Sequence, residues 1–144
     1  MSNFGQRMTV TFSAGCLGGL INSLALWLIG QAGITAQFGV KLTPSLSTEW
    51  LYPRIVWGGI WGFLFLFPLL RSDTLLQGLL LSLGPTLVQL FIVFPIQTGK
   101  GLMGFDLGNL TPLFVLFFNA IWGICTAFWL KFIQENAGIG QMES

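Results

Sequence analysis

The sequence has very little charge. It holds six basic and five acidic residues in 144, or 8% of the chain, whereas apolar residues make up 53%. Soluble domains carry roughly 25% charged residues, because a water-facing surface needs polar groups. The composition therefore excludes an ordinary soluble domain and indicates an integral membrane protein. The net charge of +1 without a basic run gives nucleic-acid binding no electrostatic basis.

Histidine is absent altogether. The chain thus lacks the commonest metal ligand, the usual proton carrier near neutral pH and the usual axial ligand of haem. The serine and threonine residues have no histidine to act as their base, neither cysteine has a basic neighbour, and no cluster of metal ligands is present. We therefore expect no enzyme, no metal site and no cofactor. Contact with pigment or lipid stays open, because chlorophyll can also be held by Asn, Gln, water or a carbonyl.

Ionisable residues are also missing from the centres of the apolar segments. Such residues are typical of proton relays and ion-coupled transport, so their absence disfavours a pump, an antiporter or a voltage sensor. The two cysteines, Cys16 and Cys125, lie inside apolar runs, where thiols usually behave as small hydrophobic groups.

Four apolar segments predict membrane-spanning helices at about 8–31, 53–70, 75–96 and 110–133. We expect an all-α polytopic fold, a four-transmembrane-helix bundle in one domain (1–133), followed by a polar, mobile tail (134–144). The first segment is longer than the apolar core of a secretory signal, so we expect it to be retained. The second is short, with Pro53 at its first helical position. Thr74 and Gln77 match a capping box before the third, and Pro85 predicts a kink within it.

The two longer connections, 32–52 and 97–108, are expected on one side of the membrane, with both termini on the other. The looped side holds Lys41, Arg54 and Lys100, and the terminal side holds Arg7, Arg71 and Lys131. Three basic residues on each side give the positive-inside rule no majority. Because the latter three lie close to span ends, we expect the termini on the cytoplasmic side.

Small residues recur every four positions in each predicted span, which keeps them on one helix face and allows close backbone approach. We expect these stripes to form the inward packing seam, although small residues can also line a permeation path. The predicted packing residues are Gly15, Gly19, Ser23, Gly58, Gly62, Gly78, Ser82, Gly123 and Ala127.

Three amides lie deep in the predicted spans: Asn22, Gln89 and Asn119. An amide in hydrocarbon needs a partner, so we expect all three to face the interior as interhelical glue, or alternatively to bind a ligand. At the interface we expect contacts of Arg54, Trp50, Tyr52 and Trp57 with lipid or a partner. Arg54 is expected to snorkel or to pair with Glu49 or Asp106, or alternatively to contact an anionic lipid or substrate on the looped side.

Short matches in constant order suggest an internal duplication. Residues 42–44 recur at 110–112 as Leu-Thr-Pro, and residues 60–62 recur at 121–123 as Ile-Trp-Gly. They predict a parallel two-plus-two repeat of the kind found in some transporters. Chance matches within a membrane composition are the alternative.

The pattern Gln77-Gly78, Gln89-Leu90-Phe91, Phe94-Pro95, Gly104-Phe105-Asp106-Leu107 and Trp122 resembles the second half of the YagU-like family of bacterial inner-membrane proteins. The resemblance covers about half of the chain. It implies four spans and a bacterial inner membrane, to which a thylakoid is the alternative, and it brings no catalytic residues with it.

Two functions are compatible with these patterns. The first is a non-catalytic accessory or structural subunit of a larger membrane complex, such as a bioenergetic or photosynthetic one, held by contacts with lipid, other subunits or further copies of itself. The second is a small channel or transporter for a neutral or weakly polar solute.

Overall fold

The computed structural model is all-helical in the residues that it describes, which are 3–67, 69–70 and 72–143, with side-chain environments through residue 136. Its elements in chain order are α1 (Phe4–Gln31), α2 (Ile34–Gln37), α3 (Thr48–Gly62), η1 (Phe63–Leu66), α4 (Thr74–Leu81), α5 (Leu83–Val88), η2 (Gln89–Gln97), η3 (Leu102–Gly104) and α6 (Thr111–Glu143).

Three helical segments are long and apolar enough to cross a membrane: Phe4–Gln31, Thr74–Gln97 and Thr111–Asn136. They correspond to the first, third and fourth predicted spans. The predicted second span is divided between α3 and the 3₁₀-helix η1, so it is not one long helix. That this segment also crosses the membrane stays a prediction. Near its predicted end, residue 68 lies outside the described residues, as does Arg71.

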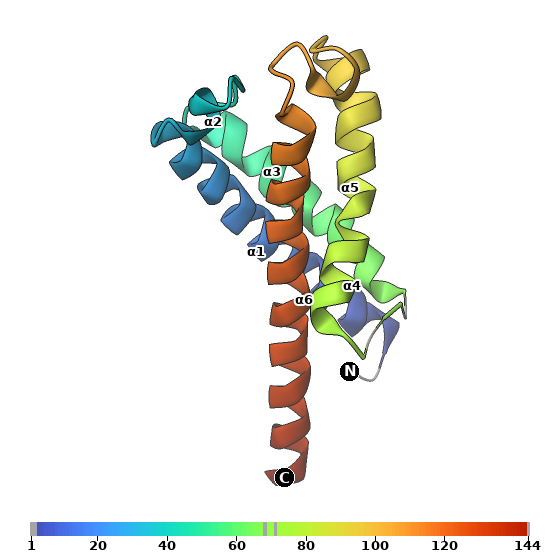
Figure 1. Cartoon of the computed structure of the whole chain (residues 1–144). Helices are drawn as coiled ribbons and strands as arrows, with labels where there is room; N and C mark the ends of the chain where they lie inside the picture. The colour runs from blue at the N-terminus through green and yellow to red at the C-terminus, as the bar shows by residue number, and fades with distance from the viewer. Residues whose placement is uncertain (1–2, 68, 71, 144) are drawn as a thin grey trace.

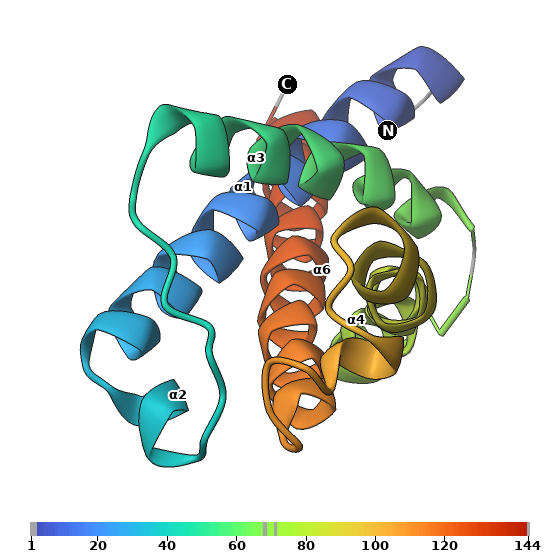
Figure 2. The same cartoon turned by 90° about the horizontal axis from the view of Figure 1, so that it is seen from above.

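The helices form two antiparallel pairs, α1 with α3 and α4 with α6, and the two pairs are joined where α6 packs on α1. Figure 1 shows the two termini at one end and the long connections at the other. Seen from above, α6 stands between the α1–α3 pair and the α4–α5 segment (Figure 2).

The third predicted span is interrupted. Helix α4 ends at Leu81, α5 begins at Leu83, and from Gln89 the chain continues as a π-helix. Pro85 cannot donate a backbone hydrogen bond to the residue four positions earlier, so the break falls one turn before it, as the expected kink requires. The π-helical part was not predicted.

Two helix starts differ from the sequence-based expectation. The N-cap of α4 is Asp73, whose carboxylate accepts from the Leu76 amide at 3.1 Å, so the capping box predicted at Thr74 is wrong. Helix α3 starts at Thr48, where Ser47 accepts from the Trp50 amide at 3.3 Å, so Pro53 lies inside the helix and not at its first position.

Helix α6 continues to Glu143, past residue 133, where the fourth span was expected to end. The segment predicted as a polar tail therefore extends the helix, and in Figure 1 it projects beyond the ends of the other helices.

Candidate functional site: a basic cavity between the helices

Arg54 lies in the second turn of α3, on the face that packs against α1. The sequence placed it at a helix N-terminus, free to reach the interface. Because α3 starts earlier, at Thr48, the Arg54 side chain instead enters the space between the helices. Its partner Ser23 is eight residues before the end of α1, which puts it about 12 Å along the axis from that end.

The Arg54 guanidinium bonds to α1 through two nitrogens. Its Nε donates to Ser23 Oγ at 2.8 Å, and its Nη2 donates to Asn22 Oδ1 at 2.7 Å. The guanidinium carbon also lies 4.9 Å from the centre of the Trp50 ring, a cation–π distance. The expected pairs with Glu49 and Asp106 are not formed, and none of the described carboxylates is bonded to Arg54.

Asn22 connects three helices at this point. Its side-chain oxygen accepts from Arg54 of α3, while its Nδ2 donates to the Phe118 carbonyl of α6. Asn119, the next residue of α6, donates to Thr86 Oγ1 of α5 at 3.1 Å. Asn22 and Asn119 therefore form hydrogen bonds between helices, and both side chains also face open space.

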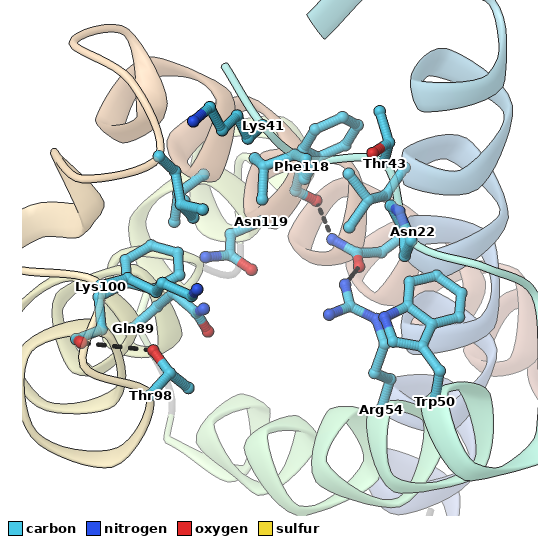
Figure 3. A pocket seen from close by; sticks show the side chains of 16 residues that line it. Asn22, Lys41, Thr43, Trp50, Arg54, Gln89, Thr98, Lys100, Phe118 and Asn119 are labelled. Atoms are coloured by element: carbon cyan, nitrogen blue, oxygen red, sulfur yellow. Dashed lines mark hydrogen bonds between the residues drawn. The ribbon is translucent and has the colours of Figure 1, made fainter. Parts of the chain in front are cut away.

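That space is a cavity of about 370 Å³ at the looped end. Its walls come from α1, α3, η2 and α6 and from both long connections, and its polar side chains converge from opposite sides (Figure 3). The lining side chains are Asn22, Leu26, Lys41, Leu42, Thr43, Pro44, Trp50, Arg54, Gln89, Phe94, Thr98, Lys100, Leu107, Val115, Phe118 and Asn119. Three of them are cationic and none is acidic.

A second cavity of about 330 Å³ adjoins the first. The two share Asn22, Arg54, Gln89 and Asn119, so these four side chains stand where the spaces meet. The second cavity lies between α3 and the α5–η2 segment, and its remaining walls are largely apolar. They are formed by Gly19, Pro53, Trp57, Gly58, Trp61, Pro85, Val88, Val93, Gln97 and Trp122.

The guanidinium keeps hydrogen-bonding capacity toward these spaces. It carries five N–H donors, and the described contacts use one from Nε and one from Nη2. A charge removed from water costs free energy unless it is paired, and neutral oxygens compensate it less well than a carboxylate or a phosphate. The cavity can thus bind an anion through donors that are already held in place.

The connecting loops bring two of the three cations. The Lys41 amide donates to the Leu107 carbonyl at 2.9 Å, which joins the first long connection to the second. A Cβ on Gly108 would clash with the Gly39 carbonyl, so this close approach requires glycine. Lys41 and Lys100 are themselves exposed at the mouth of the cavity.

The small residues form two seams and not one common interior face. A Cβ on Gly58 would lie 2.7 Å from the Gly15 carbonyl and 3.0 Å from the Gly19 Cα, and one on Gly62 would lie 3.0 Å from the Gly15 Cα. Between α4 and α6, a Cβ on Gly78 would lie 2.7 Å from the Gly123 carbonyl.

The remaining predicted residues lie as follows. Ser23 is fully buried at the Arg54 contact, Ser82 is buried facing Gly123, and Ala127 is buried among apolar side chains. Tyr52 and Trp57 are 60% and 58% exposed, as side chains that face lipid would be, whereas Trp50 is half-buried under Arg54.

The opposite end has a polar cavity of about 480 Å³, lined by Arg7 and Lys131 among others. Arg7 donates to the Leu66 carbonyl at 3.1 Å and thereby ties α1 to the end of η1. Between the two ends lies Trp122, which is buried and donates from Nε1 to the carbonyls of Gly15 (3.2 Å) and Gly58 (3.3 Å).

Comparison of the chain with family models, characterised proteins and solved structures gives no match. The resemblance to the YagU-like family therefore stays a prediction. In the part of the chain that the structure describes, no three His, Cys, Asp or Glu side chains gather as metal ligands would.

Proposed function

We propose that the protein is a non-catalytic multi-pass membrane protein that binds the anionic group of a small ligand in the basic cavity. The observation that carries the proposal is Arg54, held between helices by two neutral oxygens with donors left over. Lys41 and Lys100 line the same cavity and add to its positive potential. A cavity of this size with a few convergent polar groups is typical of a small-molecule site.

An anion fits this cavity better than the neutral solute considered from the sequence. Three cations without an acidic counterpart among the lining residues favour negative charge, and a bound anion would relieve the cost of keeping Arg54 away from water. Arg also binds carboxylate and phosphate bidentately, which adds directional selectivity. A neutral solute would gain little from this arrangement.

The proposal includes four crossings. Helix α3 has 15 residues and η1 has four. At 1.5 and about 2.0 Å per residue, they reach about 30 Å together, which is close to the thickness of the hydrocarbon core. A return through the membrane between α1 and α4 also leaves both termini on one side, as Figure 1 draws them. Whether the two hairpins arose by duplication stays a prediction.

Calorimetric titration of the protein purified in a neutral maltoside tests the binding. Inorganic phosphate, butyl phosphate and butyrate are the probes, with butylamine as a cationic comparison. We expect saturable binding of the anions that is weakened about tenfold or more in Arg54→Met, because a bidentate charged contact contributes more than 1.4 kcal/mol. Lys100→Gln, in an exposed loop position, should weaken binding by a smaller factor without affecting folding.

Lys131→Gln is the matched control, since it removes the same charge from the opposite cavity. Binding that is absent, or that falls as much in Lys131→Gln as in Arg54→Met, would refute the proposal. The accessory-subunit prediction is examined separately by mild-detergent purification from the native membrane. A stoichiometric co-purifying protein would support it.

A further inference from the structure

We infer that the ligand is an anionic amphiphile, whose head group binds at Arg54 and whose hydrocarbon chain leaves sideways between α3 and the α5–η2 segment. This inference rests on the proposed anion site and adds the class of ligand and its route. It comes from the joining of two unlike cavities at one charged side chain.

The two cavities differ in the charged side chains that line them on either side of Arg54. The first holds Lys41 and Lys100 and is bordered by the polar connections at the looped end. The second has Trp57, Trp61 and Val88 among its walls and no charged side chain other than the shared Arg54. A ligand that is charged at one end and apolar at the other matches both cavities.

The second cavity lies at a gap in the helix packing. Helix α3 packs chiefly on α1, and η2 packs chiefly on η3 and α5, whereas α3 has no comparable pairing with α5 or η2. Residues of both sides nevertheless line the same cavity. Trp57, on the α3 side, is 58% exposed, so this wall continues to the surface that faces the hydrocarbon.

Neither simpler class of ligand uses both spaces. A small soluble anion would occupy the first cavity and leave the second empty, although most of the side chains that line only the second cavity are apolar. An uncharged lipid would occupy the second and leave Arg54 without a counter-charge. An alkyl phosphate or a fatty acid satisfies both, because its chain can remain in lipid while its head group contacts the guanidinium.

Val88 and Leu87 allow a test in adjacent positions. Val88 lines the second cavity and is half-buried, whereas Leu87 is 55% exposed and is not among the lining residues. Val88→Trp should fill the chain route, and Leu87→Trp adds the same side chain on the outer face. Neither residue is among those that line the first cavity.

Each variant is titrated in maltoside micelles with butyl phosphate and with hexadecyl phosphate, and bound ligand is counted by native mass spectrometry. A variant is compared with the unmodified protein for one ligand at a time, so partition of the ligand into micelles cancels. We expect Val88→Trp to weaken hexadecyl phosphate about tenfold and to leave butyl phosphate within about twofold. Leu87→Trp should change neither.

Hexadecanoate and hexadecanol, run in parallel, separate the head group from the chain. The affinity for hexadecanoate should change in each variant as the affinity for hexadecyl phosphate does. The affinity for hexadecanol should be the same in Arg54→Met as in the unmodified protein. Equal weakening of short and long phosphates by Val88→Trp, or no effect on either, would overturn the lateral route while leaving the anion site intact. If the unmodified protein bound none of the anions, the proposed function itself would be refuted.

Discussion

The contact between Arg54 and Asn22 can be measured by a double-mutant cycle. The unmodified protein is compared with Arg54→Met, Asn22→Leu and the double variant. Both substitutions remove the side-chain hydrogen-bonding groups, and Leu keeps the branching of Asn at Cγ. Asn22 also bonds to the Phe118 carbonyl, but that loss occurs in both Asn22 variants and cancels in the cycle.

The expected coupling follows from the kind of hydrogen bond. Neutral interhelical bonds in membrane proteins average about 0.6 kcal/mol, with a maximum near 1.7 kcal/mol. Hydrogen bonds to charged groups contribute about 1.5–3 kcal/mol. The 2.7 Å bond from Arg54 Nη2 to Asn22 Oδ1 borders a cavity, which lowers its contribution. We therefore expect a coupling of about 1.5 kcal/mol, at the lower end of the charged range.

The free energies come from equilibrium unfolding in mixed maltoside and dodecyl sulfate micelles, followed by far-ultraviolet circular dichroism. A second cycle, Arg54→Met with Glu49→Gln, is the control. If Arg54 reached the interface and paired with Glu49, that cycle would give the larger coupling. A coupling below about 0.3 kcal/mol for Asn22, together with a larger one for Glu49, would refute the inward placement of Arg54.

Four further substitutions test the packing. Gly58→Leu places a side chain where even a Cβ would lie 2.7 Å from the Gly15 carbonyl, so unfolding in mixed micelles should become easier by about 3 kcal/mol, near the upper end for overpacking. In Gly84→Ala the new Cβ would lie 2.9 Å from a Leu64 methyl group and 3.5 Å from the Trp61 ring, both side chains, so the free energy of unfolding should stay within about 1 kcal/mol of that of the unmodified protein. Equal effects of the two glycine substitutions would contradict the α1–α3 seam. Trp122→Phe removes the indole donor shared by Gly15 and Gly58 and should cost about 1–2 kcal/mol, read out as a lower unfolding midpoint. Thr111→Val should instead stabilise the protein by about 1 kcal/mol, because the buried Thr111 hydroxyl has no partner among the described residues, and a loss of stability would show that this hydroxyl is bonded.

The sequence predicted the long helices well, because a hydrocarbon environment demands uninterrupted apolar runs of about 20 residues and few sequences can meet that demand by chance. It predicted α3 poorly. Ser47 is a good N-cap residue, and Glu49 in the first turn interacts favourably with the helix dipole, so both indicate the observed start at Thr48. The predicted start was at Pro53, because proline is common at the first position of a helix.

The inward direction of Arg54 could also have been found. Arg54, Gly58 and Gly62 are four residues apart and thus share one helix face, and Gly19 and Ser23 continue the facing stripe on α1. Antiparallel packing of those stripes brings Arg54 to Ser23. Snorkelling depends on how deep a charge lies, whereas the direction of the Arg54 side chain follows from the helix face that it shares with Gly58 and Gly62.

Other features carried no sequence signal. Lys41 and Lys100 lie in two loops that are joined by the hydrogen bond from the Lys41 amide to the Leu107 carbonyl. Lys41 and Leu107 are 66 positions apart in the chain, so the sequence gives no local sign of the contact. The π-helix from Gln89 also depends on tertiary packing, since no residue pattern distinguishes it from an α-helix.

The bond between the two loops has a consequence for how the molecule could be divided. The first hairpin supplies Lys41 and Arg54, and the second supplies Lys100 and Asn119. Cutting the chain between α3 and α4 would thus leave two fragments, neither with a whole pocket. Co-expressed, they could regain it only by finding each other in the bilayer, so ligand recognition would report directly on their reassembly.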